Sequence, residues 1–218
     1  MNGLFITFEG TEGGGKSTQM ARLAERLTAL RLKVHQLREP GGTPIGEEIR
    51  HTLKHSPANP AMTPETELLL MNGSRAQLVR EVIRPALAAG EVVLCDRFYD
   101  STVAYQGYGR GLDLTSVCRV IEFAVGETKP DLTLLLRVSV AVSEERRSAR
   151  GAGQRDRFEE ADREFFLRVE SGYEAIAKAE AKRVKIIEAT QSPEAVSAEI
   201  WRHVQPLIIA LEKLAQAH

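Results

Sequence analysis

Hydrophobic residues gather into five short runs along the chain, separated by longer segments in which apolar residues recur with helical spacing. The runs cover residues 4–8, 34–38, 91–96, 132–138 and 184–188. Short apolar strands that alternate with helices are typical of a parallel sheet whose two faces are both covered. The sequence therefore predicts an α/β fold with a five-stranded parallel sheet and helices on both faces.

The segments between these runs repeat apolar residues every three or four positions, as one face of a helix does. The first two such faces are Leu23, Leu27 and Leu30, and Ile45, Ile49 and Leu53. A long helix is expected to begin at Thr63 and Pro64, with Leu69 among its apolar positions and a bend at Pro85. Other helices are expected at residues 43–54, 114–125, 143–150, 159–182 and 193–214.

Residues 10–17, between the first strand and the first helix, read G-T-E-G-G-G-K-S and match the phosphate-loop pattern G-x-x-x-x-G-K-[ST]. Glycines let backbone N–H groups surround phosphate oxygens, and the helix N-terminus adds partial positive charge. Lys16 can reach the β- and γ-phosphates, and the Ser17 hydroxyl can bind Mg²⁺. The alternative is a glycine-rich turn without a ligand. We expect a P-loop NTPase-type sheet that binds a nucleoside triphosphate at Gly10, Thr11, Glu12, Gly13, Gly14, Gly15, Lys16, Ser17 and Thr18.

Length and charge suit one soluble domain covering residues 1–218. The net charge of −1 points to neither a nucleic-acid nor a membrane partner. The two cysteines, Cys95 and Cys118, form no C-x-x-C motif and suit a reducing compartment. The sequence shows no secretory leader pattern and no apolar run of about 18 residues. We therefore expect a cytoplasmic protein.

Two residues after the third strand carry candidate chemistry. Asp96 lies where phosphate-loop proteins place a carboxylate for Mg²⁺ or its water, and Arg97 has the forked shape that binds phosphate. The mixed polar and aromatic residues 98–107 that follow suit a pocket for a base and a sugar. The alternatives are a buried ion pair at Asp96 and an ordinary polar helix start at residues 98–107.

Five arginines lie around a glycine break and predict a lid at about residues 146–158. They are Arg146, Arg147, Arg150, Arg155 and Arg157, with Gly151 and Gly153 between them. Glycine-hinged segments close over phosphates in phosphoryl-transfer enzymes, and an arginine delivered there raises the rate by about 10³–10⁵. The alternative is a solvated helix face in which nearby glutamates pair with these arginines.

Several motifs, in order along nearly the whole chain, resemble the thymidylate kinase family. They are F-E-G before the phosphate loop, E-P-G-G-T at residues 39–43, S-R-A-Q at 74–77, D-R at 96–97, S-T-V-A-Y-Q-G at 101–107, R-G-L-D at 110–113, K-P-D-L-T-L-L-L at 129–136 and A-T-Q at 189–191. The resemblance implies a five-stranded parallel core, a homodimer, and a Mg²⁺-dependent nucleoside monophosphate kinase domain. Its reaction would be transfer of the ATP γ-phosphate to dTMP, giving dTDP and ADP.

The resemblance also implies roles for residues that match the family motifs. Arg75 would hydrogen-bond thymine, with Thr102 also facing the base, and Arg97 would hold the dTMP phosphate. Tyr105 would pack under the deoxyribose, and Glu12 would lie near the 3′-hydroxyl. Weaker assignments of the same kind are Arg38 and Gln106 for dTMP. At position 71, where the family usually has a thymine-stacking phenylalanine, this chain has Met71.

The phosphate loop has no arginine at its variable positions, so the resemblance assigns the catalytic arginine to the lid, where Arg150 matches best. Arg146 and the turn at residues 189–192 are candidates for contacts with adenine. Two alternatives stay open. The acceptor could be another nucleoside monophosphate or a deoxynucleoside, or the protein could be a nucleotide-binding switch without catalysis.

Overall fold

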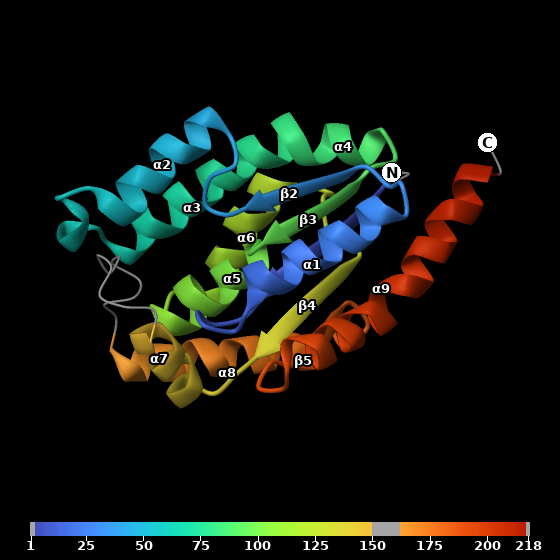
Figure 1. The fold of residues 1–218 in the computed structure, drawn as a ribbon. Coiled ribbons are helices and arrows are strands. Elements are labelled where there is room, and N and C mark those ends of the chain that lie inside the picture. Colours follow the sequence, from blue (N-terminus) through green and yellow to red (C-terminus); the bar gives the residue numbers. More distant parts are fainter. Residues whose placement is uncertain (1–2, 150–161, 217–218) are drawn as a thin grey trace.

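The computed structural model of the protein describes residues 3–149 and 162–216. Five parallel strands form one sheet in the order β2-β3-β1-β4-β5, which confirms the predicted architecture. The strands are β1 (Leu4–Glu9), β2 (Val34–Arg38), β3 (Val92–Asp96), β4 (Leu132–Arg137) and β5 (Val184–Glu188). The arrowheads of β2, β3 and β4 point to the same side of the molecule in Figure 1. In such sheets ligands bind at the carboxyl ends of the strands.

The helices lie between the strands close to where apolar spacing predicts them. They are α1 (Lys16–Ala29), α2 (Pro44–His55), α3 (Pro64–Leu78), α4 (Arg84–Ala88), α5 (Tyr99–Thr102), α6 (Leu114–Val125), α7 (Val140–Ala149), α8 (Arg163–Ala179) and α9 (Pro193–Gln216). Side chains of Thr43, Thr63, Asp113 and Asp162 cap α2, α3, α6 and α8 by accepting backbone N–H bonds. Within the described ranges, no helix is both long and apolar enough to cross a membrane.

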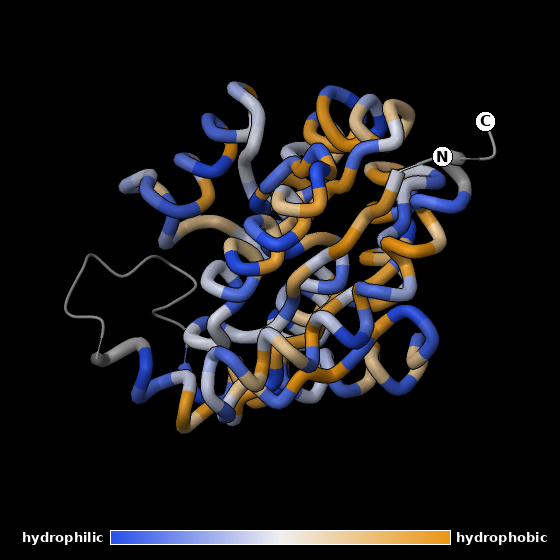
Figure 2. The backbone as a smooth tube through the Cα atoms, turned by 45° about the vertical axis from the view of Figure 1, so that its right-hand side comes forward, coloured by the Kyte–Doolittle hydropathy of each residue, from blue (hydrophilic) through white to orange (hydrophobic). Residues whose placement is uncertain are grey.

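Helices cover both faces of the sheet, and the alternation of side chains along β1 shows how. Leu4, Ile6 and Phe8 pack against α1 and α9, whereas Phe5 packs on the other face against α3, α4 and α6. Helix α8 covers the remaining part of that second face, beside β4 and β5. Figure 1 shows α1 in front of the strands, and in Figure 2 the outer helices change colour within each turn, as amphipathic helices do.

Three apolar residues do not lie where helical spacing suggested. Leu30 was expected to continue the buried face that Leu23 and Leu27 form on α1. The helix ends at Ala29, and Leu30 is exposed. Ile45 and Leu69 are also exposed, although Leu53 on the same helix as Ile45 is fully buried. Spacing identifies one face of a helix, but burial depends on which elements cover that face.

Two segments adopt π-helical geometry. Val79–Ile83 joins α3 to α4 just before Pro85, which lacks an N–H group to continue an α-helical ladder. The expected bend therefore takes the form of a π-helical segment. Val103–Gly109 continues α5, so residues 98–107, for which no regular period was found, are largely helical. The predicted helix at residues 159–182 begins outside the described residues, and its described part is α8.

A buried ion pair joins Arg183, the residue before β5, to Asp100 on α5, on the far side of the sheet from α1. Arg183 donates from both terminal nitrogens to the two oxygens of Asp100, at 2.7 and 2.9 Å. Thr133 on β4 adds a hydrogen bond of 3.2 Å to the same carboxylate. Because both side chains are largely removed from water, each depends on the other for compensation of its charge.

Replacing Arg183 by methionine should lower the free energy of unfolding by about 3–5 kcal/mol, because the Asp100 carboxylate is then left buried without its counter-ion. Urea denaturation measures this loss. Glu180→Gln, which removes only the exposed partner of the same arginine, should cost less than about 1 kcal/mol. Equal losses in the two variants would contradict the importance of the buried pair.

Candidate active site

The carboxyl ends of β1, β2 and β3 bring three predicted motifs together. Phe8 and Arg38 both lie opposite Asp96 in the sheet register. The phosphate loop leaves β1 beside Asp96 and Arg97, and the turn that begins at Glu39 leaves β2 on their other side. The site is therefore formed by the order of the strands and not by proximity in sequence.

The phosphate loop has the backbone that its glycines permit. Gly10 has φ of +126°, and a Cβ atom there would lie 2.4 Å from the carbonyl oxygen of Leu136. Gly15 has φ of +84° and starts α1. Lys16 donates to the carbonyl oxygens of Gly10 and Thr11 at 3.1 and 2.9 Å. Burial, reinforced by the charge of Arg97, lowers the pKa of Lys16 from 10.5 to about 8. A polyphosphate in the loop would supply the negative charge that this ammonium lacks.

The two predicted metal ligands are in direct contact. The Ser17 hydroxyl donates to Asp96 Oδ2 at 2.9 Å. A hydroxyl and a carboxylate are the hard oxygen ligands that Mg²⁺ prefers. Among residues 3–149 and 162–216, no group of three or more His, Cys, Asp or Glu side chains could hold a metal by itself. The pair therefore fits an ion that is bound mainly through phosphates and water.

A cavity of about 590 Å³, the phosphate-loop cavity, lies over the loop. Arg146 reaches its rim and donates to the carbonyl oxygens of Gly13 and Ala189, so it joins the loop to the turn after β5. Basic side chains outnumber acidic ones in the lining, which suits a polyanion. The basic ones are Lys16, Arg38, Arg50, Lys54, Arg97 and Arg146, and the acidic ones are Glu12, Glu39 and Asp96.

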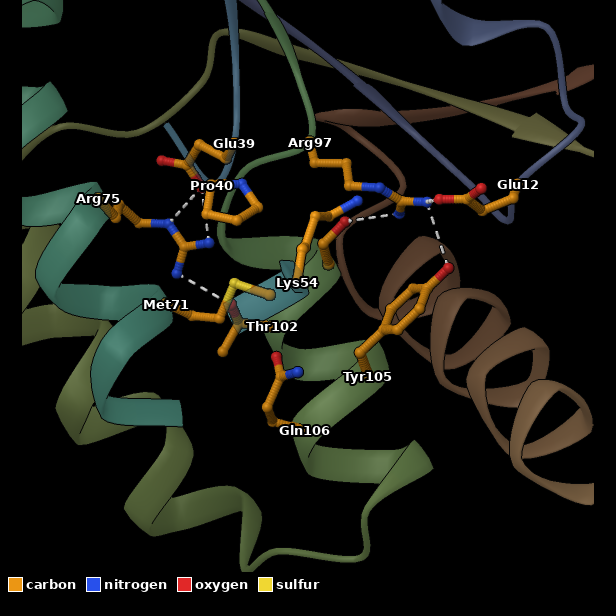
Figure 3. A pocket seen from close by; sticks show the side chains of 11 residues that line it. Glu12, Glu39, Pro40, Lys54, Met71, Arg75, Arg97, Thr102, Tyr105 and Gln106 are labelled. Carbon is orange, nitrogen blue, oxygen red and sulfur yellow. Dashed lines mark hydrogen bonds and ion pairs between the residues drawn. The ribbon is translucent and has the colours of Figure 1, made fainter. Parts of the chain in front are cut away.

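A second pocket, the Arg75 pocket, adjoins this cavity and is shown in Figure 3. Its Arg97 end is charged, and the far end carries Met71, Thr102 and Gln106. The π-helical segment after α5 presents Tyr105 and Gln106 to the pocket. The lining residues are Glu12, Glu39, Pro40, Lys54, Met71, Arg75, Arg97, Ser101, Thr102, Tyr105 and Gln106.

Arg97 lies between the two cavities in a backbone conformation that is unusual for a residue other than glycine, with φ of +70°. Its Nη1 donates to the Gly10 carbonyl oxygen at 3.0 Å, and its Nη2 donates to the Tyr105 hydroxyl at 3.2 Å. Glu12 Oε1 lies 3.7 Å from the same Nη2. The guanidinium group is thus held at the junction of the loop and the pocket.

A buried carboxyl group supports Arg97 from behind. Glu9 accepts hydrogen bonds from the Phe98 N–H at 2.7 Å and from the hydroxyls of Ser101 and Tyr173 at 2.6 and 3.0 Å. The same two hydroxyls accept from Arg97 Nη1 at 3.1 and 3.2 Å. Tyr173 is on α8, so this network links that helix to Arg97.

Arg75, which is expected to hydrogen-bond thymine, lines the pocket and already has partners within the protein. Its side chain is 2% exposed, and each of its three nitrogens has a partner in the protein. Glu39 Oε2 accepts from Nε and lies 2.7 Å from Nη2, the Phe98 carbonyl accepts from Nη2, and Asn72 and Thr102 accept from Nη1. A base carbonyl can contact this guanidinium group only by replacing one of these acceptors.

Two further predicted residues have other partners, and one lies outside the described part. Gln106 donates to the buried carboxylate of Glu67 at 2.7 Å, and Glu67 also pairs with Arg110. Arg38 lines the phosphate-loop cavity but not the Arg75 pocket, and its contact with dTMP stays a prediction. Arg150 and the rest of the predicted lid after Ala149 lie outside the described residues.

Sequence reasoning missed four residues of the site. Glu9 and Tyr173 lie 164 positions apart, and nothing in the local pattern connects them. Arg50 and Lys54 look like the polar face of an amphipathic helix, yet both line the phosphate-loop cavity. The spacing of four between Arg50 and Lys54, one turn apart on the same face, was the available signal.

Fold and site together define a P-loop nucleotide-binding protein with a second pocket beside the phosphate loop. The chain belongs to the thymidylate kinase family, because the model of that family, described as Thymidylate kinase, matches residues 8–200. A thymidylate kinase of Pseudomonas syringae pv. tomato is 50% identical over 208 residues, covering 95% of this chain and 98% of the relative. One from Deinococcus radiodurans is 48% identical over 204 residues, covering 93% and 96%.

A solved structure supports the same assignment. The crystal structure of thymidylate kinase from Ehrlichia chaffeensis is similar, with a TM-score of 0.76 and 32% sequence identity. The match covers 93% of this chain and 98% of that one.

The pH dependence of stability should report the buried carboxyl group of Glu9. Burial, with a contribution from the charge of Asp100, raises its pKa from 4.5 to about 7, against the opposing effects of Ser101, Arg97 and the Phe98 N–H. Between these two values the folded protein holds a proton that the unfolded chain releases. The stabilisation is fully present below pH 4.5 and is lost as the pH rises through 7.

Glu9→Gln removes this titration. Relative to the variant, the wild type should therefore lose about 3 kcal/mol of unfolding free energy as the pH rises across this window. Urea denaturation at a series of pH values measures the difference, and Glu180→Gln serves as the exposed control. Parallel pH profiles for wild type and Glu9→Gln would contradict the raised pKa.

Proposed function

We propose that the two cavities serve the ATP-dependent phosphorylation of dTMP to dTDP, with ATP in the phosphate-loop cavity and dTMP in the Arg75 pocket. The protein is a kinase of the thymidylate kinase family. The observation that carries the residue assignment is the position of Arg97. It lies at the junction of the two cavities, where it contacts the carbonyl of Gly10 and the hydroxyl of Tyr105.

On the ATP side, the loop N–H groups and Lys16 would hold the β- and γ-phosphates. Ser17 and Asp96 would hold Mg²⁺, which would neutralise part of the negative charge of the phosphates. Arg146 would border the site for adenine, because it joins the phosphate loop to the turn after β5. Positive charge from the lid at residues 146–158, with Arg150 at the γ-phosphate, completes this proposal.

On the acceptor side, Arg97 would bind the dTMP phosphate and Tyr105 would pack under the deoxyribose. Met71, Thr102 and Gln106 would surround the base, with Arg75 bonded to Thr102 in the same wall. Met71 offers a polarizable thioether where a ring would stack, which covers the base but orients it less strongly. Glu12 would lie near the sugar and the reacting phosphates.

The reaction requires mainly that the protein orients the two substrates and places positive charge around the transferring group. The acceptor is a phosphate oxygen, and the second phosphate pKa of about 6 leaves it largely ionised at neutral pH. No general base is therefore needed, and catalysis rests on in-line positioning and on cations around the transferring group. A nucleotide switch would leave the acceptor-side set of Arg97, Tyr105 and Met71 without a role.

We also propose that the protein is a homodimer formed through α2, α3 and α6. These helices pack side by side. Each exposes a large apolar side chain, and Phe123 on α6 is 86% exposed. The others are Ile45 on α2 and Leu69 on α3. Exposed apolar residues on adjacent helices are typical of an interface between copies.

Arg97→Ala should lower kcat/KM for dTMP by about 10²–10⁴, because two charge-assisted hydrogen bonds of about 1.5–3 kcal/mol each are lost. The KM for ATP should stay close to that of the wild type. The assay is dTDP and ADP formation with dTMP, dUMP, dCMP, UMP and thymidine supplied separately. Wild type should favour dTMP over dUMP by about 10-fold or more, the effect of one methyl group in an apolar pocket.

Full activity of Arg97→Ala would contradict the assignment of Arg97. Equal use of dUMP and dTMP would show that the Arg75 pocket does not select the methyl group of thymine. Absence of product with all five acceptors would favour the nucleotide-binding switch. Arg97→Lys is the matched control, because it keeps the charge but loses the forked geometry.

Phe123→Asp should convert the dimer into a monomer, because a carboxylate in an apolar interface is costly to desolvate. Sedimentation velocity measures the mass of wild type, Phe123→Asp and the conservative control Phe123→Leu. A monomeric wild type, or a Phe123→Asp variant that stays dimeric, would contradict the proposed interface.

A further inference from the structure

The phosphate-loop cavity and the Arg75 pocket share four lining residues, which are Glu12, Glu39, Lys54 and Arg97. Under the proposed function, ATP occupies one cavity and dTMP the other. A phosphoryl group that moves from ATP to dTMP must therefore pass between these four side chains. They mark the point of transfer without reference to a bound ligand.

Two of the four residues, Glu12 and Glu39, are acidic, and the other two, Lys54 and Arg97, are basic. Glu39 is committed to Arg75, with Glu39 Oε2 2.7 Å from Arg75 Nη2 and both side chains almost fully buried. Glu12 lies 3.7 Å from Arg97. The transferring group is negative throughout, so only the two cations can stabilise it directly. Among the residues that the structure describes, Lys54 is the cation other than Arg97 that lines both cavities.

Helix α2 holds Lys54 in place through the turn after β2. Thr43 caps the helix by accepting the Gly46 N–H at 3.0 Å. One turn before Lys54, Arg50 Nη1 donates to the Pro40 carbonyl at 2.8 Å and so ties the last turns of α2 to the pocket wall. Lys54 follows Arg50 at a spacing of four, on the same face of the helix. Figure 3 shows its side chain extending toward the Arg97 end of the pocket.

The phosphate loop supplies little positive charge of its own, so a further cation at the point of transfer would be useful. Its variable positions Thr11, Glu12, Gly13 and Gly14 carry no basic residue, so the loop side of the γ-phosphate has only Lys16. Lys16 lines the phosphate-loop cavity but not the Arg75 pocket. Lys54 reaches the transfer point from the opposite wall, formed by α2, and it is partly shielded from water. Partial burial strengthens the attraction of an ammonium group for phosphate.

We propose that Lys54 is a further catalytic residue, whose ammonium group donates to a non-bridging oxygen of the phosphoryl group in transit. In that step an oxygen of the acceptor phosphate bonds to the γ-phosphorus. The bond from the γ-phosphorus to the β,γ-bridging oxygen breaks, and its electron pair leaves with ADP. Lys54 moves no proton. It offsets the negative charge that the two substrates bring together, and this role rests on the proposed function.

The test compares Lys54→Met, which keeps the length of the side chain but removes its charge, with Lys54→Arg, which keeps the charge. The matched control is Lys178→Met, at an exposed position in the last turn of α8 outside both cavities. The readouts are kcat and KM for dTMP and ATP, measured as dTDP formation, and the melting temperature of each variant.

Lys54→Met should lower kcat by about 10- to 100-fold, the effect of one hydrogen bond to a charged group. Both KM values should change little, because the interaction is strongest during transfer. Lys54→Arg should recover most of the loss, and the melting temperatures should match that of Lys178→Met.

Three results would overturn the role of Lys54. They are a kcat of Lys54→Met equal to that of Lys178→Met, a loss that Lys54→Arg does not restore, and a loss that follows a lowered melting temperature. Normal turnover of dTMP by the wild type in the same assay keeps the proposed function intact in all three cases. Absence of dTDP with the wild type would overturn both.

Discussion

Glu9 ends the central strand with a carboxyl group that is fully removed from water, and such a group is costly unless its oxygens are hydrogen-bonded. Its partners come from three places in the chain: the Phe98 N–H, Ser101 on α5 and Tyr173 on α8. The two hydroxyls also hold Arg97. The need to satisfy one buried acid therefore fixes Arg97, the start of α5 and the position of α8 relative to each other.

The same principle recurs around the Arg75 pocket. Glu39 holds Arg75, Glu67 holds Gln106 and Arg110, and Asp100 holds Arg183. Each acid fixes a side chain of the pocket or an element behind it, because a buried polar group is stable only when its partners are in place. Such networks add little net stability, but they define one arrangement of side chains. These partners organise the walls of the Arg75 pocket, and such preorganisation would lower the cost of orientation if the pocket holds the acceptor as we propose.

How much could be predicted from the sequence depends on whether the signal is local. The phosphate loop and the strands were predictable, because glycine spacing and short apolar runs are properties of neighbouring residues. The exposure of Leu30, Ile45 and Leu69 was not, because burial depends on which helices cover each face. The contact between Glu9 and Tyr173 arises only when α8 packs beside the sheet. Lys54 enters the site through the position of α2, which its own sequence does not reveal.

Arg75 shows why identifying a residue by its motif does not settle how it acts. Each of its three nitrogens already has a partner inside the protein. A base carbonyl that contacts Arg75 therefore exchanges one hydrogen bond for another, and such an exchange contributes less than a new bond would. Thr102 lies beside the guanidinium group in the wall of the pocket and accepts from it at 2.9 Å. If this pocket holds the base, as we propose, the shape of the wall formed by Met71, Thr102 and Gln106 then contributes to selectivity, and Arg75 helps to hold that wall in place.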